Sequence, residues 1–155
     1  KLHRIKKWDL IIAHPPCTYL CKVSSVWMVK NGKVDQQRYE KMLEAREFFL
    51  ECLGACANYV AVENPLPMAR AQLPRPSFFA DPSWYGFKYT KKTLYWVKNL
   101  PPLMPKYVNP TNKSFVHSSR GKFRSRTFAG LADAIADQWG SFILSELSKK
   151  DPLNV

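Results

Sequence analysis

Glycine is scarce in this sequence, and long apolar runs are missing from it altogether. Only six of the 155 residues are glycine, and they are scattered singly, so no glycine-rich turn follows an apolar segment. No apolar run approaches the roughly 20 residues that a membrane-spanning helix needs, and no signal peptide is recognisable. The sequence therefore predicts a globular, cytoplasmic protein without a membrane partner and without a glycine-rich ligand-binding turn.

Cysteine is too rare for a disulfide scaffold. The four cysteines are few for a chain of this size, and we expect them to be reduced thiols. Cys52 and Cys56 have the i, i+4 spacing that could hold a metal on a helix. No second pair lies at the spacing of a zinc ribbon, so we expect these two thiols to pack against apolar neighbours and we expect no metal.

Acidic residues are half as numerous as basic ones, and the imbalance is concentrated in one segment. Asp and Glu total 12 against 24 Lys and Arg, which gives a formal net charge of +12. Residues 66–128 contain twelve of the basic residues and a single acid, Asp81. This basic, loop-rich segment predicts a surface for a polyanion, and DNA is the partner that we expect. A generally basic, solvated surface is the alternative.

Hydrophobic periodicity predicts a small set of elements within one domain, residues 1–155. Asp35 is a suitable N-cap for the first helix, whose apolar positions recur at i, i+3, i+4 and i+7 up to Gly54. The order strand, helix, strand, loop, strand, helix implies an α/β fold whose mixed, mostly parallel sheet is flanked by helices. The expected strands are 9–13, 59–62 and 93–97, and the expected helices are 35–53 and 127–147.

Two of the expected strands end in polar residues and proline. The first runs into HPPC, which ends at Cys17, and the second runs into ENP, which begins at Glu63. If the helix between them is a crossover, the strands are parallel and their carboxyl ends share one edge. A thiol and a carboxyl in one crevice would suit covalent attack on an electron-poor ring. The alternative for Cys17 is a small buried hydrophobe beside a core strand.

Four short blocks of sequence, spread from Trp8 to Gly140, carry a family resemblance. They are WDLIIAHPPCTYL at Trp8–Leu20, VENP at Val62–Pro65, KKTLYW at Lys91–Trp96 and SRTFAGLADAIADQW at Ser125–Trp139. Their order resembles that of the DNA cytosine-5 methyltransferases, and most closely that of short phage and prophage proteins of this type. The Pro-Cys pair ending at Cys17 and the Glu-Asn pair beginning at Glu63 match the two motifs that carry the family's chemistry.

The resemblance implies a DNA methyltransferase that uses S-adenosylmethionine. Cys17, as a thiolate, would add to C6 of a cytosine flipped from its stack, while Glu63 would protonate or hydrogen-bond N3. Asn64 would hold the Glu63 loop, and S-adenosylmethionine would supply the methyl group for C5. The abundance of cations would lower the pKa of Cys17 from about 8.5. The implied substrate-binding residues are Pro15, Pro16, Lys91, Lys92, Thr93 and Arg126, with Lys91, Lys92 and Arg126 meeting phosphate or the pyrimidine carbonyl.

One part of the family's fold has no counterpart in this sequence. That fold begins with a strand and a glycine-rich turn for S-adenosylmethionine, followed by a strand that ends in an acid for the ribose. Nothing before Trp8 supplies these features, so we expect a partial Rossmann-like methyltransferase fold that lacks the first cofactor-binding strands. Such a sheet would expose an edge, through which a second copy or a partner chain could pair.

Three other functions are alternatives to a cytosine-5 methyltransferase. A zinc-dependent cytidine deaminase would need P-C-x-x-C and an upstream H-x-E, whereas Cys17 and Cys21 are separated by three residues and H-x-E is absent. An amino-methyltransferase would explain a Pro-Pro loop but would leave Glu63 and Asn64 unexplained. A non-catalytic nucleic-acid-binding remnant would keep the basic segment and stack bases on aromatic side chains. The aromatics available for that stacking are Trp84, Tyr85, Phe87, Tyr89 and Trp96.

Overall fold

The protein has an α/β fold, as the order of elements predicts. The computed structural model describes residues 8–107, 113–114 and 127–150. In these ranges short strands and 3-10 turns are interspersed with two long α-helices. None of the helices there combines the length and hydropathy that crossing a membrane requires.

The chain divides into two compact units. The first comprises Lys1–Phe79 and Lys92–Leu100, and the second comprises Ala80–Lys91 and Pro101–Val155. The expectation of a single domain stays a prediction, because a division into compact units does not test whether each one folds independently.

The first unit is organised around a mixed four-stranded sheet. Its strand order is β1 (Trp8–Ala13), β4 (Ala57–Asn64), β7 (Thr93–Lys98) and β5 (Phe78–Ala80). β1 is parallel to β4, but β7 runs antiparallel to β4, so the prediction of a mostly parallel sheet is wrong. A parallel return needs a crossover, usually a helix, and the chain between β4 and β7 contains only short 3-10 turns and strands.

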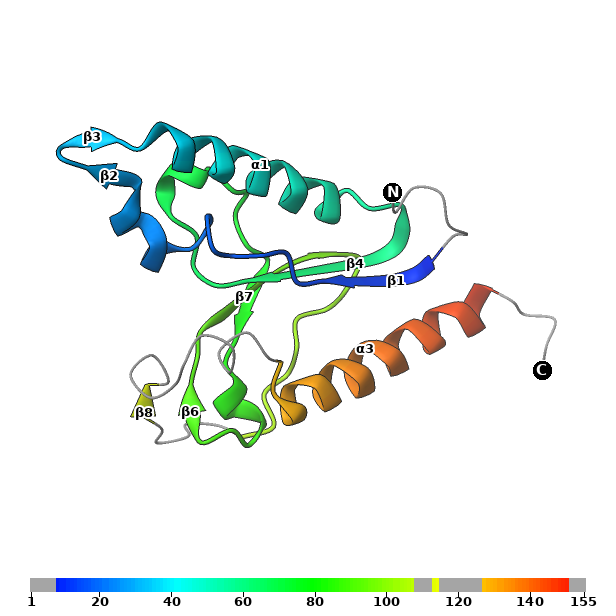
Figure 1. Cartoon of the computed structure of the whole chain (residues 1–155). Helices are drawn as coiled ribbons and strands as arrows, with labels where there is room; N and C mark the ends of the chain where they lie inside the picture. Colours follow the sequence, from blue (N-terminus) through cyan, green and yellow to red (C-terminus); the bar gives the residue numbers. More distant parts are fainter. Residues whose placement is uncertain (1–7, 108–112, 115–126, 151–155) are drawn as a thin grey trace. The chain divides into compact units, whose positions relative to one another are not determined.

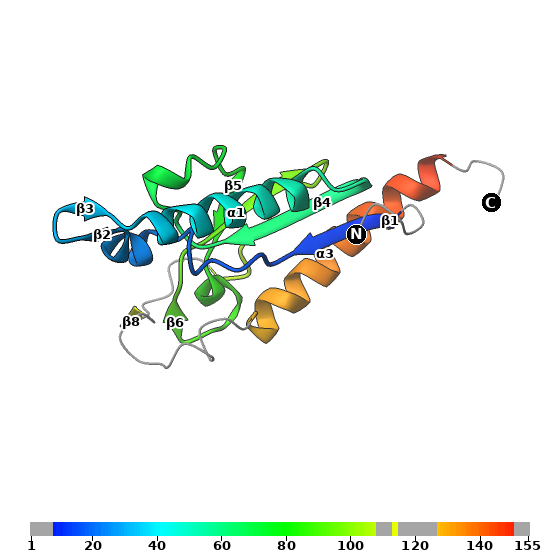
Figure 2. The ribbon, with the colours of Figure 1, turned by 45° about the horizontal axis from the view of Figure 1, so that its top comes forward.

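Helix α1 (Gln36–Leu53) is the crossover between the parallel strands β1 and β4, and it confirms the predicted helix. Asp35 caps it, because its carboxylate accepts a hydrogen bond from the Arg38 backbone N–H at 3.0 Å. At the other end the N–H of Gly54 donates to Leu50 O at 2.9 Å. The helix runs along one face of β1 and β4 (Figures 1 and 2).

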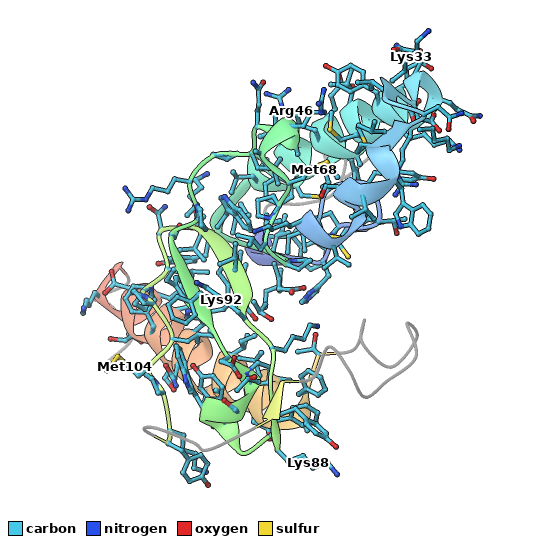
Figure 3. All side chains as sticks on the ribbon, turned by 90° about the vertical axis from the view of Figure 1, so that its left-hand side faces the viewer. Lys33, Arg46, Met68, Lys88, Lys92 and Met104 are labelled. Atoms are coloured by element: carbon cyan, nitrogen blue, oxygen red, sulfur yellow. The ribbon has the colours of Figure 1, made fainter. Side chains whose placement is uncertain are left out.

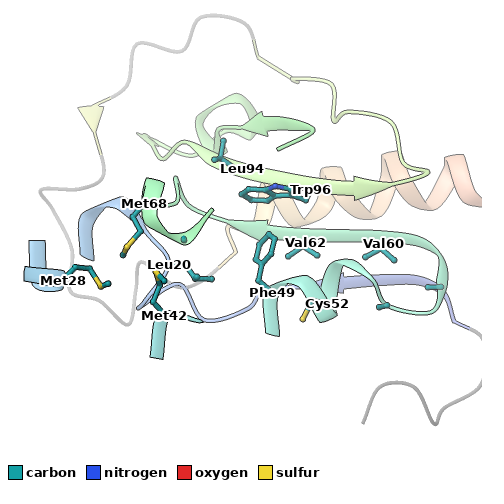
Figure 4. Close-up of a cluster of buried hydrophobic side chains, with 13 residues drawn as sticks. Leu20, Met28, Met42, Phe49, Cys52, Val60, Val62, Met68, Leu94 and Trp96 are labelled. Carbon is teal, nitrogen blue, oxygen red and sulfur yellow. The ribbon is translucent and has the colours of Figure 1, made fainter. Parts of the chain in front are cut away.

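The core of the first unit lies between α1 and the sheet (Figure 4). Phe49 of α1 is fully buried, and its ring meets Trp96 of β7 edge to face, with centroids 4.9 Å apart. The Trp96 indole N–H donates to Pro74 O at 2.7 Å, so its polar atom is satisfied within the core. The 3-10 turn η3 (Ala69–Ala71) contacts α1 and closes one end of this layer.

Residues 18–34 form a small substructure outside the sheet. A 3-10 helix, η2 (Lys22–Met28), leads into a hairpin of β2 (Val29–Lys30) and β3 (Lys33–Val34). Asn31 and Gly32 form its turn, and both residues have positive φ, 51° and 75°. The hairpin projects beyond the start of α1, and Figure 3 shows Lys33 at its end.

The second unit packs α3 (Ala129–Lys150) against the 3-10 turn η4 (Pro82–Tyr85). α3 confirms the helix predicted over 127–147, with a shift of two to three residues at each end. Gly130 is required at the contact, because a Cβ there would collide with the carbonyl oxygen of Tyr85. This unit also holds β6 (Tyr89–Thr90), which pairs in parallel with β8 (Lys113–Ser114).

Candidate active site

The ends of β1 and β4 bring the two predicted chemical motifs to one edge of the sheet. The strands are in parallel register, with Ala13 opposite Val62. The next residues, His14 after the end of β1 and Glu63 near the end of β4, therefore lie side by side. The sequence-based expectation of a parallel β1–β4 pair with a shared carboxyl edge is confirmed.

Asn64, the last residue of β4, connects the end of that strand to the loop that follows β1. Its side chain is 1% exposed, and its amide Nδ2 donates to the carbonyl oxygen of Pro15 at 3.1 Å. The amide oxygen is buried and has no hydrogen-bond partner among the described residues. Because Pro15 and Pro16 also restrict the backbone, the loop before Cys17 is held rigidly against the loop after β4.

Glu63 is oriented by a residue that sequence reasoning did not select. The carboxylate oxygen Oε2 of Glu63 lies 3.0 Å from His14 Nδ1, and the two side chains are 18% and 43% exposed. His14 therefore fixes one carboxylate oxygen while the group remains reachable from solvent. A sequence signal did exist, since His14 and Glu63 each follow an apolar strand directly and both strands were expected to be parallel.

The Cys17 thiol is hydrogen-bonded to a second thiol, that of Cys21. Cys17 O accepts the backbone N–H groups of Leu20 and Cys21, each at 3.0 Å, which folds the segment into a turn. The thiol of Cys17 hydrogen-bonds Cys21, and this bond, together with burial and the charge of Glu63, raises the pKa of Cys17. The same bond, aided by Ser24, lowers the pKa of Cys21 to about 5.

The expectation that cations lower the pKa of Cys17 is therefore wrong. The nearest influences on that thiol are Cys21, burial and Glu63, and each of them disfavours the thiolate. The Ser24 hydroxyl donates to Cys21 O at 2.8 Å and lies 3.4 Å from Cys21 Sγ. The pair therefore consists of a protonated thiol, Cys17, and a thiolate, Cys21, that can act as its base.

Alkylation across pH should reveal this unequal pair. Because the pKa of Cys21 lies near 5, its thiolate is nearly complete above about pH 6, and its reaction rate with iodoacetamide should be flat from pH 6 to 8. An ordinary thiol of pKa about 8.5 should react roughly tenfold faster per pH unit over that range. Tandem mass spectrometry of the tryptic peptide would separate the two cysteines. A tenfold rise per pH unit at Cys21 would contradict the assignment.

The start of β7 reaches the same edge, because β7 is antiparallel to β4. Leu94 pairs with Asn64, so Lys92 and Thr93 enter the sheet beside the end of β4. Thr93 is buried, whereas Lys92 is exposed and its Nζ lies 4.5 Å from the centroid of the Phe79 ring. A parallel β7 would have placed both residues at the opposite end of the sheet.

Two of the predicted substrate-binding residues are not brought to this edge by the first unit. Lys91 belongs to the second unit, where its Nζ lies 5.6 Å from the centroid of the Phe128 ring. Arg126 lies outside the described residues. The phosphate-binding role expected of these two side chains stays a prediction.

The residues at the strand ends do not fit S-adenosylmethionine. β1 runs into two prolines, β4 runs into Pro65, and β7 ends at Asn99 with φ 57°, so none of these turns has a glycine that would let a ligand approach the backbone. Within the described ranges there is also no group of three His, Cys, Asp or Glu side chains placed to hold a metal. Among the described residues, the ends of β1, β4 and β7 therefore offer no glycine-bearing turn for the methyl donor.

Comparison with known proteins adds no family assignment. The sequence matches no protein-family model, and no curated protein matches it significantly. The resemblance to cytosine-5 methyltransferases therefore rests on the four sequence blocks, and it stays a prediction.

Proposed function

We propose that this chain is the catalytic part of a DNA cytosine-5 methyltransferase-like enzyme, with a partial Rossmann-like fold. In this proposal it adds the Cys17 thiol to C6 of a cytosine in DNA. The observation that carries the proposal is the Asn64–Pro15 hydrogen bond between the ends of two parallel strands. This bond holds the loop of the Cys17 thiol against the end of the strand that carries the Glu63 carboxylate, and attack on a polarised ring requires such an arrangement.

The side chains present can carry out the addition step with protons and electrons in balance. The sulfur–C6 bond forms as the Cys17 proton passes to the Cys21 thiolate. The C5=C6 π electrons move through C5 towards N3, where Glu63, oriented by His14 and acting in its protonated form, gives its proton to N3 and is left as a carboxylate. S-adenosylmethionine, the donor that the resemblance implies, would supply the methyl group for C5, but the described residues offer it no fitting site.

Hydrogen exchange at C5 tests this addition without any methyl donor. In D₂O the adduct should take up deuterium at C5, and elimination of Cys17 should then release a cytosine one mass unit heavier. A cytosine-containing oligonucleotide incubated with the protein should therefore gain deuterium, as measured by mass spectrometry of the nucleosides. Cys17→Ser should abolish the gain, because a hydroxyl is a far weaker nucleophile than a thiol.

The controls separate chemistry at Cys17 from chemistry at any exposed thiol. Cys56→Ser removes an exposed cysteine outside this edge and should leave the exchange unchanged. Exchange that persists in Cys17→Ser, or that is absent from the unmodified chain, would overturn the proposed addition.

A non-catalytic, nucleic-acid-binding protein is the second candidate. The raised pKa of Cys17 favours it, because it leaves the thiol protonated. In the second unit the rings of Phe87 and Phe128 stack with centroids 3.8 Å apart, and Lys91 lies over Phe128, so aromatic and basic groups adjoin there. Oligonucleotide binding without deuterium exchange would support this candidate.

We also propose a partner at the exposed edge of the sheet. β1 is the outer strand of the sheet in the part of the chain that the structure describes. Its apolar residues Trp8 and Ile12 are 49% and 38% exposed. We propose that a second copy or another chain pairs along this edge. Light scattering on the purified protein, alone and with DNA, would test this. A particle mass equal to one chain in both samples would oppose the proposal.

A further inference from the structure

A small hollow is lined in part by Tyr19, two residues after Cys17. It has a volume of about 180 Å³. Sites for drug-sized ligands occupy about 300–1,000 Å³, so this hollow suits a single planar ring or a phosphate group and excludes a whole cofactor. The lining residues are Tyr19, Trp27, Lys30, Asp35, Arg38 and Lys41, which come from the Cys17 loop, the η2–β2 segment and the start of α1.

The charge in the hollow is positive. Lys30 is neutralised by Asp35, with Nζ and Oδ2 2.7 Å apart. Arg38 and Lys41 have no such ion pair with a described carboxylate, and they lie 5.0 and 5.8 Å from the centroid of the Tyr19 ring. Two cations therefore remain available to an anion on this surface.

Arg38 connects the hollow to the catalytic loop. Its Nη2 donates to the carbonyl oxygen of Thr18, the residue after Cys17, at 3.4 Å. Its Nε is buried and has no partner among the described residues. A group bound to the Arg38 guanidinium would therefore lie next to the loop of the proposed nucleophile, because Thr18 directly follows Cys17.

The other wall of the hollow offers an aromatic surface. Trp27 is 63% exposed, which is high for the largest apolar side chain, and its neighbours Val23 and Val26 on η2 are 65% and 69% exposed. An exposed indole beside cations is the combination on which unpaired bases stack, with the backbone phosphate held by Lys or Arg.

We propose that this hollow binds an unpaired nucleotide next to the target cytosine, with its base stacked on Trp27 and its phosphate held by Arg38 and Lys41. The proposal rests on the proposed function, because it names the form of DNA that reaches Cys17. A paired base has its faces covered by neighbouring pairs, so the hollow should favour single strands over duplexes.

Equilibrium binding tests the proposal without requiring catalysis. Fluorescence anisotropy would measure the Kd of a labelled single-stranded oligodeoxynucleotide, its duplex and the RNA of the same sequence. Trp27→Ala should raise the single-strand Kd about tenfold and Trp27→Phe far less, because the phenyl ring still stacks. Trp8→Ala is the matched control, since Trp8 is also exposed, at 49%, and lies outside the hollow.

The phosphate contact has its own readout. Lys41→Gln should reduce the slope of log binding constant against log salt by about 0.7, the amount expected for one lost phosphate contact on a single strand. Lys149→Gln removes the same charge from α3, where Lys149 pairs with Glu146, and should leave the slope unchanged.

The outcomes distinguish this proposal from the proposed function. Equal Kd values for Trp27→Ala and Trp8→Ala, or tighter binding of the duplex, would overturn the hollow as a nucleotide site while deuterium exchange at C5 could still succeed. Failure of the unmodified chain to bind any oligonucleotide would overturn both. Tighter binding of the RNA than of the DNA would support the hollow and would change the substrate class of the proposed function.

Discussion

Phe49→Ala should lower the free energy of unfolding by about 3–5 kcal/mol, the usual loss for removing a fully buried phenyl ring. Phe49 is 0% exposed, and its ring fills the space between α1 and Trp96 of β7. Alanine would leave a cavity that neither backbone can close, because α1 is fixed at both ends by its caps. Since small domains are stable by about 5–15 kcal/mol, the loss would be a large part of the total.

The adjacent residue provides a matched control for this prediction. Phe48 is 45% exposed, so Phe48→Ala removes the same ring from the same helix without opening an enclosed cavity. Its loss should remain below about 1 kcal/mol. Urea unfolding followed by circular dichroism would measure both variants. Similar losses for the two would show that the α1–β7 layer is not the core of this unit.

The elements that were predicted correctly are those that bury one face in a regular pattern. Helix α1 has Asp35 as a cap and apolar positions at helical spacing, and both features are local. β4 and β7 are apolar runs that are buried over most of their length, and β1 is an apolar run of the same kind at the outside of the sheet. Such patterns fix the type of an element, although they leave its ends uncertain by one or two residues.

The direction of β7 could not be read from its own residues. A strand has the same alternation in either direction, so only the connection decides how it pairs. The segment between β4 and β7 is proline-rich, lacks an α-helix and was predicted to be a loop. Without a crossover helix, β7 is expected to pair antiparallel to β4, whereas the sheet was predicted to be mostly parallel. The hairpin of β2 and β3 was also missed, since each strand has two residues and both are exposed.

The candidate site shows the same division between local and spatial information. Cys17, Glu63 and Asn64 could be selected because they follow apolar strands directly. His14 and Cys21 were missed because their importance lies in what they touch: the Glu63 carboxylate at 3.0 Å and the Cys17 thiol. Charge counted along the sequence likewise failed to predict the pKa of Cys17, because the groups that shift it are one thiol, Cys21, and one carboxylate, Glu63, together with burial.

Asn64→Asp should destabilise the protein by about 3 kcal/mol near pH 8 although the two side chains have the same shape. The amide Nδ2 donates to Pro15 O, and an ionised carboxylate has no proton to donate there. The replacement would put a negative charge, 1% exposed, against a carbonyl oxygen and next in sequence to Glu63. Burial without a donor raises the pKa of the introduced carboxyl above the 3.9 or so of the unfolded chain.

The loss should therefore depend on pH with a definite sign. Below about pH 4 the introduced carboxyl is protonated in both states and can donate to Pro15 O, so the variant should approach the parent. As pH rises towards the raised folded-state pKa, the unfolded chain releases the proton first, and the difference should grow by about 1.4 kcal/mol per pH unit before levelling off. Urea unfolding from pH 4 to 8 would measure it. Asn58→Asp, at an exposed position of the same strand, is the control, and its loss of unfolding free energy should not change with pH above pH 5. An equally constant loss for Asn64→Asp would mean that Asn64 does not hold the end of β4 against the loop after β1.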